Sequence, residues 1–282
     1  MGDFADLPGA ERADAEAVAA TLEGVGRLGI AYSGGVDSAV LLAVANRTLG
    51  PDRVVALLAV SPSLAGQELE LARQVAADLG ANLVEFATHE QQRPEYRANG
   101  ADRCYHCKAE LFERIEDTLV DVHRLDDVAY GENADDAVAP DRPGARAASE
   151  HRVLRPLAEA GLTKVRVRAL ARALGLRVAD KPAAPCLASR IPHGHEVTPS
   201  KLAQVEAAEK VLRALGFTDS RVRHHGSIAR IEVPLTELSR FADDEVRREA
   251  LRAIRAAGFA NVTIDLAGMQ SGAFTLQVGR RG

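Results

Sequence analysis

The 282 residues are enough for one large or two moderate domains, and a hydrophobic fraction of 46% allows a substantial core. The formal net charge of −5 argues against a protein that binds nucleic acid over a broad basic surface. No apolar run approaches the roughly 20 residues of a membrane span, and the acidic first twenty residues do not resemble a signal peptide. Because the three cysteines are an odd number, which is more typical of a reducing compartment than of a disulfide framework, we expect a cytoplasmic protein without membrane partners.

The first 131 residues alternate between amphipathic helices and short apolar strands. We expect helices over residues 13–24, 37–49, 67–79 and 107–120, and strands over residues 28–32, 53–60, 81–87 and 126–131. Continuous apolar runs such as RVVALLAV are typical of strands that are buried on both faces. The predicted fold class is therefore α/β, a parallel sheet with helices on both faces.

The later residues predict a second, smaller unit. The polar stretch 134–150 lacks helical periodicity, so we expect a loop there, and Thr163 is expected to cap the next helix. Residues 180–199 contain four prolines and are expected to be largely irregular. A helix that begins at Thr198-Pro199, strands near 228–233 and 261–266 and a helix near 243–257 predict a small α+β domain. We expect the domains to span residues 1–192 and 193–282.

The segment SGGVDS, at residues 33–38, lies between a predicted strand and a predicted helix. Gly34 and Gly35 allow the backbone to approach an anion, and the hydroxyl groups of Ser33 and Ser38 add donors to the first amides of the helix. Asp37 would repel phosphate unless it faces Mg²⁺ or fixes the turn. Because the segment has no lysine and no Walker pattern, it suits a pyrophosphate group that leaves rather than a γ-phosphoryl group that is transferred.

SGGVDS resembles the SGGxDS motif of the PP-loop, or ATP pyrophosphatase, superfamily. Gly131, Asn133 and Asp135 in YGENADD resemble its second nucleotide-binding motif, and LTKVRVRALARALGL resembles its later helix. Ser61 follows the second predicted strand, where adenine docks in such sheets. The resemblance implies ATP and Mg²⁺ as cofactors, adenylation of a substrate oxygen and release of pyrophosphate.

The three cysteines help to decide whether a nitrogen or a sulfur nucleophile then displaces AMP. Cys104 and Cys107 form the C-x-x-C pattern of RCYHCK, and Cys186 lies in the proline-rich APCLASR. Their polar or proline-rich surroundings differ from those of cysteines in a hydrophobic core. From the pattern alone, redox chemistry, a zinc site completed by His106 or His193, and a [4Fe–4S] cluster on three thiolates all stay open.

Five segments together look like those of the LarE-type ATP-dependent sulfur transferases: SGGVDSAVLL, RCYHCKAELF, GENADD, KPAAPCLASRIPHG and VTIDLAGMQSGAF. This resemblance implies a small-molecule nucleotide substrate, a pyridinium dicarboxylate mononucleotide, whose carboxylates become thiocarboxylates in nickel-pincer nucleotide synthesis. It implies sulfur either from Cys186, which is left as dehydroalanine, or from a cluster on Cys104, Cys107 and Cys186, the variant we favour for a three-cysteine chain. It also implies a homo-oligomer.

Three arginines are further candidates for the site. Arg221 and Arg223 would point the same way in an extended segment and suit a phosphate monoester, although a solvated basic strand has the same pattern; the resemblance favours the substrate phosphate. Arg190, four residues after Cys186, is expected to neutralise the adenylate or the carboxylate, with a surface salt bridge as the alternative.

Three other functions compete with sulfur transfer. A C–N ligase of the same superfamily needs an ammonia source and leaves the three cysteines unexplained. The net charge of −5 argues against a tRNA thiolase. A nucleotide-sensing module would bind ATP without releasing pyrophosphate, and its behaviour would not depend on the cysteines.

Overall fold

The computed structural model describes residues 2–138 and 143–269, which form two compact units. The first unit comprises Met1–Ser61, Gly66–His89 and Cys104–Ala184, and the second comprises Pro62–Ala65, Glu90–Arg103 and Pro185–Gly282. Compactness alone does not test the sequence-based boundary at residue 192, which stays a prediction. Within the described residues, no helix has both the length and the hydropathy needed to cross a lipid bilayer.

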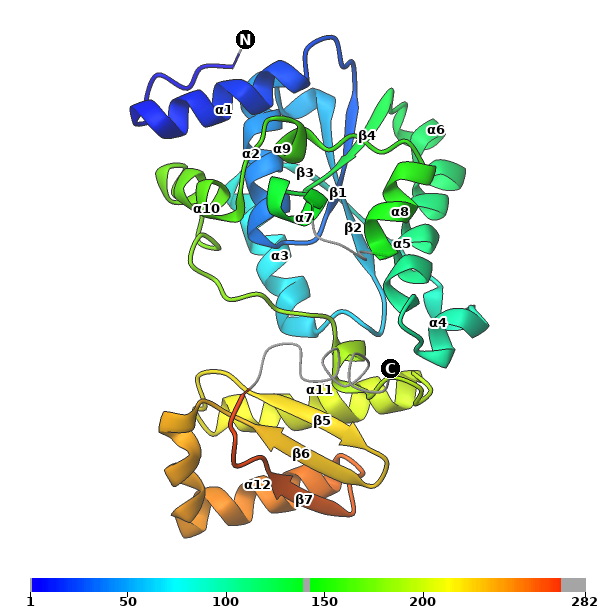
Figure 1. Ribbon diagram of the computed structural model, residues 1–282, viewed down its shortest axis with the longest axis vertical. Helices are drawn as coiled ribbons and strands as arrows, with labels where there is room; N and C mark the ends of the chain where they lie inside the picture. Colours follow the sequence, from blue (N-terminus) through cyan, green and yellow to red (C-terminus); the bar gives the residue numbers. More distant parts are fainter. Residues whose placement is uncertain (1, 139–142, 270–282) are drawn as a thin grey trace. The chain divides into compact units, whose positions relative to one another are not determined.

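A four-stranded parallel sheet lies at the centre of the first unit (Figure 1). Its strands stand in the order β3-β2-β1-β4, and every neighbouring pair is parallel. The strands are β1 (Leu28–Tyr32), β2 (Val54–Val60), β3 (Asn82–Ala87) and β4 (Asp127–Tyr130). In the register, Ile30 of β1 lies opposite Ala56 of β2 and Ala129 of β4.

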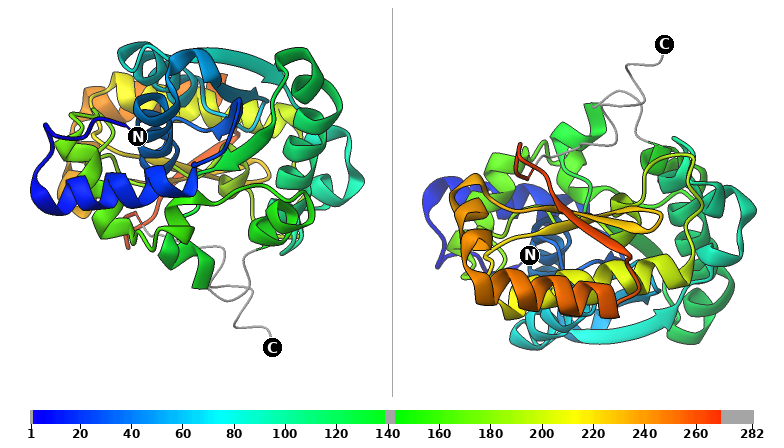
Figure 2. Two further views of the ribbon diagram at one scale, coloured as in Figure 1. Left: turned by 90° about the horizontal axis from the view of Figure 1, so that it is seen from above. Right: turned by 90° about the horizontal axis from the view of Figure 1, so that it is seen from below.

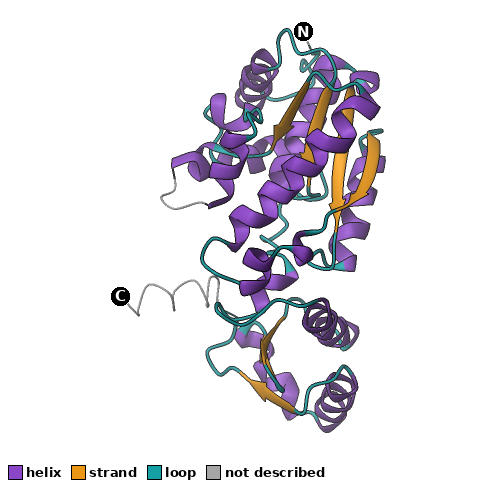
Figure 3. Ribbon diagram, turned by 90° about the vertical axis from the view of Figure 1, so that its right-hand side faces the viewer, coloured by secondary structure: helices purple, strands orange, loops and turns teal. Residues whose placement is uncertain are grey.

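Helices cover both faces of this sheet (Figure 3). One face packs against α1 (Gly9–Thr21), α2 (Val36–Leu49), α3 (Gly66–Asp78), α9 (Pro156–Glu159) and α10 (Lys164–Ala173). The other packs against α5 (Arg103–Arg114), the π-helical turn Ile115–Leu119, α6 (Val120–His123) and α8 (Pro143–Glu150). Along β2, Val54 and Ala56 enter the first core while Val55 and Leu57 enter the second. These observations confirm the predicted α/β class.

The expected loop over residues 134–150 is wrong, because this stretch forms α7 (Ala134–Val138) and α8. The amide of Asp136 donates to Asn133 Oδ1 at 3.1 Å, which satisfies a free amide in the first turn of α7. Ala147 and Ala148 of α8 are fully buried in the second core. Packing against other elements therefore stabilises a helix that the local polar pattern did not reveal.

The second unit is a three-stranded sheet with two long helices (Figure 2). Strands β5 (Arg221–His225) and β6 (Ile228–Glu232) are antiparallel, and β7 (Asn261–Ile264) pairs with β6 in parallel. α11 (Pro199–Ala214) and α12 (Asp244–Ala256) share one core with the sheet, in which the rings of Phe217 and Phe241 stack at 4.7 Å. α4 (Pro94–Ala98) and the 3₁₀ turns Leu187–Arg190 and Leu235–Ala242 complete the unit. The predicted smaller α+β fold is thus present.

The two helix caps predicted from threonine are both formed. Thr163 Oγ1 accepts from the amide of Arg166 at the start of α10, and Thr198 Oγ1 accepts from the amide of Lys201 at the start of α11. The end of the last motif, residues 270–274, lies outside the described residues.

Candidate functional site

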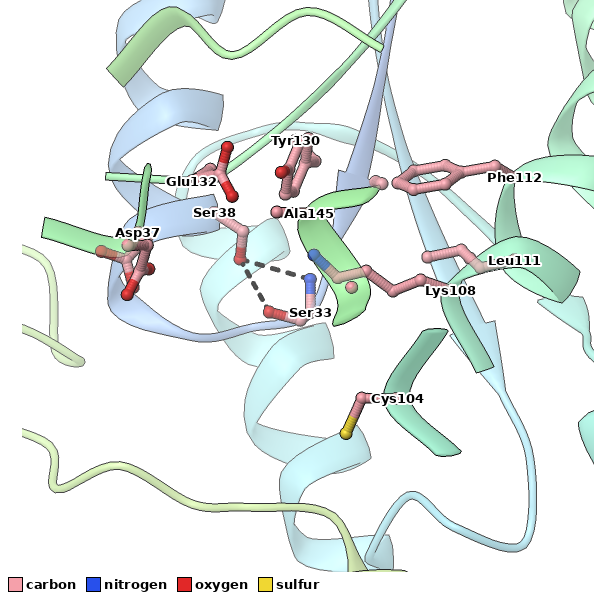
Figure 4. A pocket seen from close by; sticks show the side chains of 14 residues that line it. Ser33, Asp37, Ser38, Cys104, Lys108, Leu111, Phe112, Tyr130, Glu132 and Ala145 are labelled. Atoms are coloured by element: carbon pink, nitrogen blue, oxygen red, sulfur yellow. Dashed lines mark hydrogen bonds between the residues drawn. The ribbon is translucent and has the colours of Figure 1, made fainter. Parts of the chain in front are cut away.

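The carboxyl ends of β1 and β4 border a cavity of the first unit. Strand β1 has β2 on one side and β4 on the other, so the order of the strands reverses direction next to β1. Ligands bind at such switch points in open α/β sheets. The cavity holds about 450 Å³ (Figure 4). Its polar lining comes from the loop after β1, the start of α2, the end of β4 with the residues that follow it, α7 and α5: Ser33, Asp37, Ser38, Cys104, Lys108, Tyr130, Glu132 and Asp136.

The loop between β1 and α2 has the geometry of an anion cradle. Gly34 has φ +71°, and a Cβ there would lie 2.5 Å from the Cβ of Ala72, so only glycine fits. Gly35 immediately precedes the first turn of α2. The hydroxyl oxygens of Ser33 and Ser38 lie 3.2 Å apart, and the Ser33 amide donates to Ser38 Oγ at 3.2 Å (Figure 4). The loop therefore presents hydroxyl groups and a helix N-terminus to one space.

Gly131, at the end of β4, touches the backbone of this loop. A Cβ at Gly131 would lie 2.7 Å from the amide nitrogen of Ser38 and 2.9 Å from the carbonyl carbon of Asp37. The two segments that resemble PP-loop motifs are therefore in direct contact, although they lie almost a hundred residues apart in the sequence.

Asp37 is tied into a polar cluster with Lys164. The Asn133 amide donates to Asp37 Oδ1 at 3.1 Å and to Asp136 Oδ2 at 2.8 Å. Lys164 Nζ donates to Asp37 Oδ2, and the Lys164 amide donates to Asp135 Oδ2 at 2.7 Å. Of the two roles expected for Asp37, these contacts favour the one in which it fixes local structure.

Lys164 is a residue that the sequence analysis missed. Its helix was recognised by resemblance, but the lysine itself had no local signal. The loop at 33–38 has no lysine of its own, and Lys164 of α10 brings an ammonium group to it through Asp37.

The cavity is also lined by a second cation and by a buried carboxylate. Lys108 Nζ lies 4.1 Å from the centre of the Tyr130 ring, in a cation–π arrangement. Glu132 is only 4% exposed, and its Oε2 lies 3.6 Å from Arg155 Nη1. Burial, with the neighbouring Glu132 carboxylate, raises the pKa of Tyr130 far above its ordinary value, so the phenol stays protonated. The sequence analysis gave Lys108 no role of its own, although the residue lies within the segment RCYHCK.

In the second unit, Arg190 is buried rather than part of a surface salt bridge. Its Nε donates to Glu209 Oε1 at 2.9 Å, and both side chains are almost fully buried. Its Nη1 donates to the carbonyl oxygens of Pro185 at 2.7 Å and Cys186 at 3.3 Å. Arg190 therefore supports the backbone that carries Cys186.

Arg221 and Arg223 both lie on β5 and, two residues apart, on the same face. Arg221 donates to Asp219 and, at 2.9 Å, to the carbonyl oxygen of Ser220. Arg223, 6% exposed, donates to Glu232 Oε2 at 2.7 Å and to the carbonyl oxygen of Ser189 at 3.1 Å. Both guanidinium groups have protein partners here, so phosphate binding stays a prediction.

The cysteines belong to different units. Cys104 is exposed and lines the cavity of the first unit, and Cys107 follows one turn later on α5. Cys186 is exposed in the second unit, directly before the turn Leu187–Arg190. All three are free thiols, and within the described part of the chain no three Cys, His, Asp or Glu residues are grouped to hold a metal ion. The cluster therefore stays a prediction, as does the role of Ser61, which directly follows β2.

Comparison with known proteins agrees with this geometry. Residues 11–105, which include the loop at 33–38, match the asparagine synthase family model. A protein of Synechocystis sp., slr1717, is 43% identical over 243 residues, or 86% of this chain and 90% of its own length. Pyridinium-3,5-bisthiocarboxylic acid mononucleotide synthase of Lactiplantibacillus plantarum is 36% identical over 258 residues, or 90% of each chain.

The chain belongs to the LarE family. The resemblance seen in the sequence motifs is thereby confirmed, and both matches indicate an ATP-using enzyme of the PP-loop superfamily. Because the match to the synthase covers 90% of the chain, the LarE likeness includes residues of both units, whereas the asparagine synthase match ends at residue 105. A more distant protein, MJ0830 of Methanocaldococcus jannaschii, is 28% identical over 84% of this chain and 88% of its own.

Proposed function

We propose that this LarE family member is a sulfur transferase that adenylates a substrate carboxylate, releases pyrophosphate and forms a thiocarboxylate. The observation that supports this most directly is the first-unit cavity, which is lined by residues of the segment 33–38 and by Lys108, with Lys164 paired to the lining residue Asp37. A cradle without its own lysine, served by lysines from two other helices, suits charge that develops on a leaving pyrophosphate.

In this proposal the ATP phosphates bind at the start of α2. The first amides of α2 and the hydroxyl groups of Ser33 and Ser38 hold the pyrophosphate part, and Lys164 offsets its growing charge. Gly34, Gly35 and Gly131 shape the cradle, and Ser61 faces the adenine. Both oxygens of Asp37 already have protein donors, so Mg²⁺ would be held mainly by phosphate oxygens and water, and Asp37 would contact it only after Lys164 moves to the phosphates. The ion would neutralise phosphate charge when bound.

The acceptor carboxylate is assigned to the part of the cavity that α5 lines. Lys108 supplies a cation for the carboxylate, and Leu111 and Phe112 contribute to the apolar lining against which a flat ring would pack. The relative from Lactiplantibacillus plantarum suggests the substrate class, a pyridinium dicarboxylate mononucleotide. Its phosphate would bind Arg221 and Arg223 in exchange for their present carboxylate partners, and Arg190 would stay with the Cys186 backbone.

We assign sulfur delivery to Cys186. Its thiolate attacks the carbonyl carbon of the acyl adenylate, the C–O bond to AMP breaks, and a thioester forms. Loss of the Cys186 α-proton to a base then drives cleavage of the Cβ–S bond, which leaves dehydroalanine and frees the thiocarboxylate. The alternative is a [4Fe–4S] cluster on Cys104, Cys107 and Cys186, which would supply an iron that binds the transferred sulfur. Cys104 and Cys107, at i and i+3 of α5, lie on one helix face, as two ligands of one cluster would.

Product analysis with the mononucleotide and ATP tests this function. We expect AMP and pyrophosphate in equal amounts together with the thiocarboxylate. Cys186→Ser should stop thiocarboxylate formation while pyrophosphate release continues, because adenylation of the carboxylate does not use the thiol. A protein that loses the mass of H₂S in one turnover has used Cys186 sacrificially. A protein whose mass stays unchanged over many turnovers, and whose thiocarboxylate formation is abolished by Cys104→Ser, has used the cluster. Formation of ADP and phosphate, or of an amide from added ammonia in place of the thiocarboxylate, would contradict the proposal.

A further inference from the structure

The segment after Cys186 is anchored by a distant part of the second unit. Residues 187–197 contain no regular helix or strand beyond one 3₁₀ turn, yet Leu187, Ala188, Ile191 and Val197 are at most 1% exposed. Irregular backbone that is buried this deeply needs hydrogen-bond partners, since unpaired buried carbonyl groups are costly. The partners come from residues 63 and 97–103.

Asn99 is the centre of this anchor. It is 0% exposed and holds the left-handed conformation, φ +58°, at the end of α4. Its side-chain amide nitrogen is within hydrogen-bond distance of three carbonyl oxygens, those of Ile191 at 3.2 Å, Pro192 at 2.8 Å and His195 at 3.0 Å. Its own carbonyl oxygen accepts from the Gly194 amide at 3.1 Å. One side chain thus organises the whole turn 191–195.

Contacts on both sides of Asn99 extend the anchor to the immediate neighbours of Cys186. The Leu187 amide donates to the carbonyl oxygen of Ser63 at 2.9 Å. Arg103, 8% exposed, donates through Nη1 to the carbonyl oxygen of Ala188 at 3.0 Å and also to Asn99 Oδ1. The residues that follow Cys186 are therefore held by these hydrogen bonds, while Cys186 itself is exposed.

We propose that Asn99 and Arg103 are positioning residues for the Cys186 thiol. They touch neither the thiol nor the assigned nucleotide site, and they act by fixing the backbone from Leu187 to His195. The inference rests on the sulfur-transfer role proposed for Cys186. An attacking sulfur must lie within a fraction of an ångström of its productive position, and a displacement of about 1 Å can cost about 100-fold in rate.

The principal variant is Asn99→Asp, which keeps the size and Oδ1 of the side chain but replaces the amide donor. A carboxylate would then face three carbonyl oxygens, so the turn should detach. Asn46→Asp is the matched control: Asn46 donates to one carbonyl oxygen, that of Leu79 at 3.3 Å, within the first unit. Two quantities are compared, namely thiocarboxylate formed per pyrophosphate released and the alkylation rates of Cys186 and Cys104 by iodoacetamide, measured on separate peptides.

In Asn99→Asp we expect thiocarboxylate per pyrophosphate to fall about 10- to 100-fold, with pyrophosphate release within about twofold of wild type. Alkylation of Cys186 should change at least about threefold while that of Cys104 stays constant, and Asn46→Asp should change neither quantity. Arg103→Lys keeps the charge but not the planar donor, so both quantities should lie between those of the wild type and those of Asn99→Asp.

An unchanged thiocarboxylate-to-pyrophosphate ratio together with unchanged Cys186 alkylation in a folded Asn99→Asp protein would overturn the inference. Parallel loss of pyrophosphate release and sulfur transfer would also overturn it, because that pattern marks a general structural role. If Asn99→Asp does not fold, Asn99→Gly, which accepts the positive φ, replaces it with the same criteria. The alkylation rate of Cys186 can be measured without turnover. If the wild-type protein makes no thiocarboxylate, the proposed function is contradicted, and the alkylation rates still show whether Asn99 positions the Cys186 thiol.

Discussion

Replacement of Gly131 by alanine tests the contact that joins the two nucleotide-binding segments. The added Cβ would lie 2.7 Å from the Ser38 amide nitrogen, 2.9 Å from the Asp37 carbonyl carbon and 3.0 Å from Ser38 Cα. To restore an ordinary separation of 3.4 Å from the Ser38 nitrogen, β4 and the start of α2 must move apart by about 0.7 Å. The obstacle is backbone, so no side chain can rotate away.

The expected cost has two parts. Overpacking of this kind destabilises a protein by about 1–3 kcal/mol, so the midpoint of thermal unfolding should fall. The same displacement moves the amide and hydroxyl donors of Ser38 from the phosphate position, so ATP-dependent AMP formation should fall about 10- to 100-fold. Steady-state assays of AMP release at several ATP concentrations, with thermal unfolding in parallel, measure both effects.

Gly9→Ala is the matched control for this experiment. Gly9 begins α1 in the same unit, and a Cβ there would meet nothing within 4 Å. This substitution should leave AMP formation unchanged and leave stability unchanged or raise it by about 0.4–1 kcal/mol. Wild-type AMP formation in a folded Gly131→Ala protein would refute the claim that this contact sets the phosphate cradle.

Further variants test the remaining charges and the pH response. Lys164→Met should lower AMP formation about 10- to 100-fold by removing the cation beside the pyrophosphate, whereas Arg47→Met, which breaks an ion pair with an aspartate near the chain start, should leave it unchanged. Glu209→Gln leaves a buried guanidinium without its counter-charge, so denaturant titration should show a loss of about 3–5 kcal/mol. Burial, followed by nearby cations, lowers the pKa values of His224 and His225 below the ordinary 6.5, so the folded protein keeps them neutral. The unfolded chain takes up these protons below pH 6.5, so thermal stability should be full above that pH and fall as the pH decreases. Replacement of both histidines by glutamine should flatten this decline, and an equally steep decline would contradict the assignment.

The sequence predicted the sheet because its strands carry local signals. Strand β1 begins and ends at the predicted residues 28 and 32, since a five-residue buried run is bounded by polar and glycine positions. The loop at 33–38 was equally visible, because a glycine pair flanked by hydroxyl groups between a strand and a helix is typical of a phosphate-binding turn. Both features are properties of neighbouring residues, which a single sequence displays.

Features that depend on distant residues could not be predicted in the same way. Lys164 reaches Asp37 across 127 positions, and Asn99 meets Pro192 across 93. Neither contact follows from periodicity, caps or turn residues, because each exists only once the chain is folded. Helix α8 belongs to the same class, since burial of its alanines on another element outweighs its polar composition.

The aspartate within the phosphate loop, which would repel phosphate if it stood alone, becomes useful once Lys164 is paired with it. Without a lysine the carboxylate would weaken anion binding at the start of α2, whereas the pair of Lys164 and Asp37 leaves the loop close to neutral. A triphosphate carries more negative charge than one carboxylate, so it competes with Asp37 for the same ammonium group. When pyrophosphate leaves, Asp37 is again the nearest partner for Lys164. In the proposed mechanism Asp37 therefore keeps the ammonium group of Lys164 at the site between turnovers. A lysine side chain without such a partner would not be held in one position.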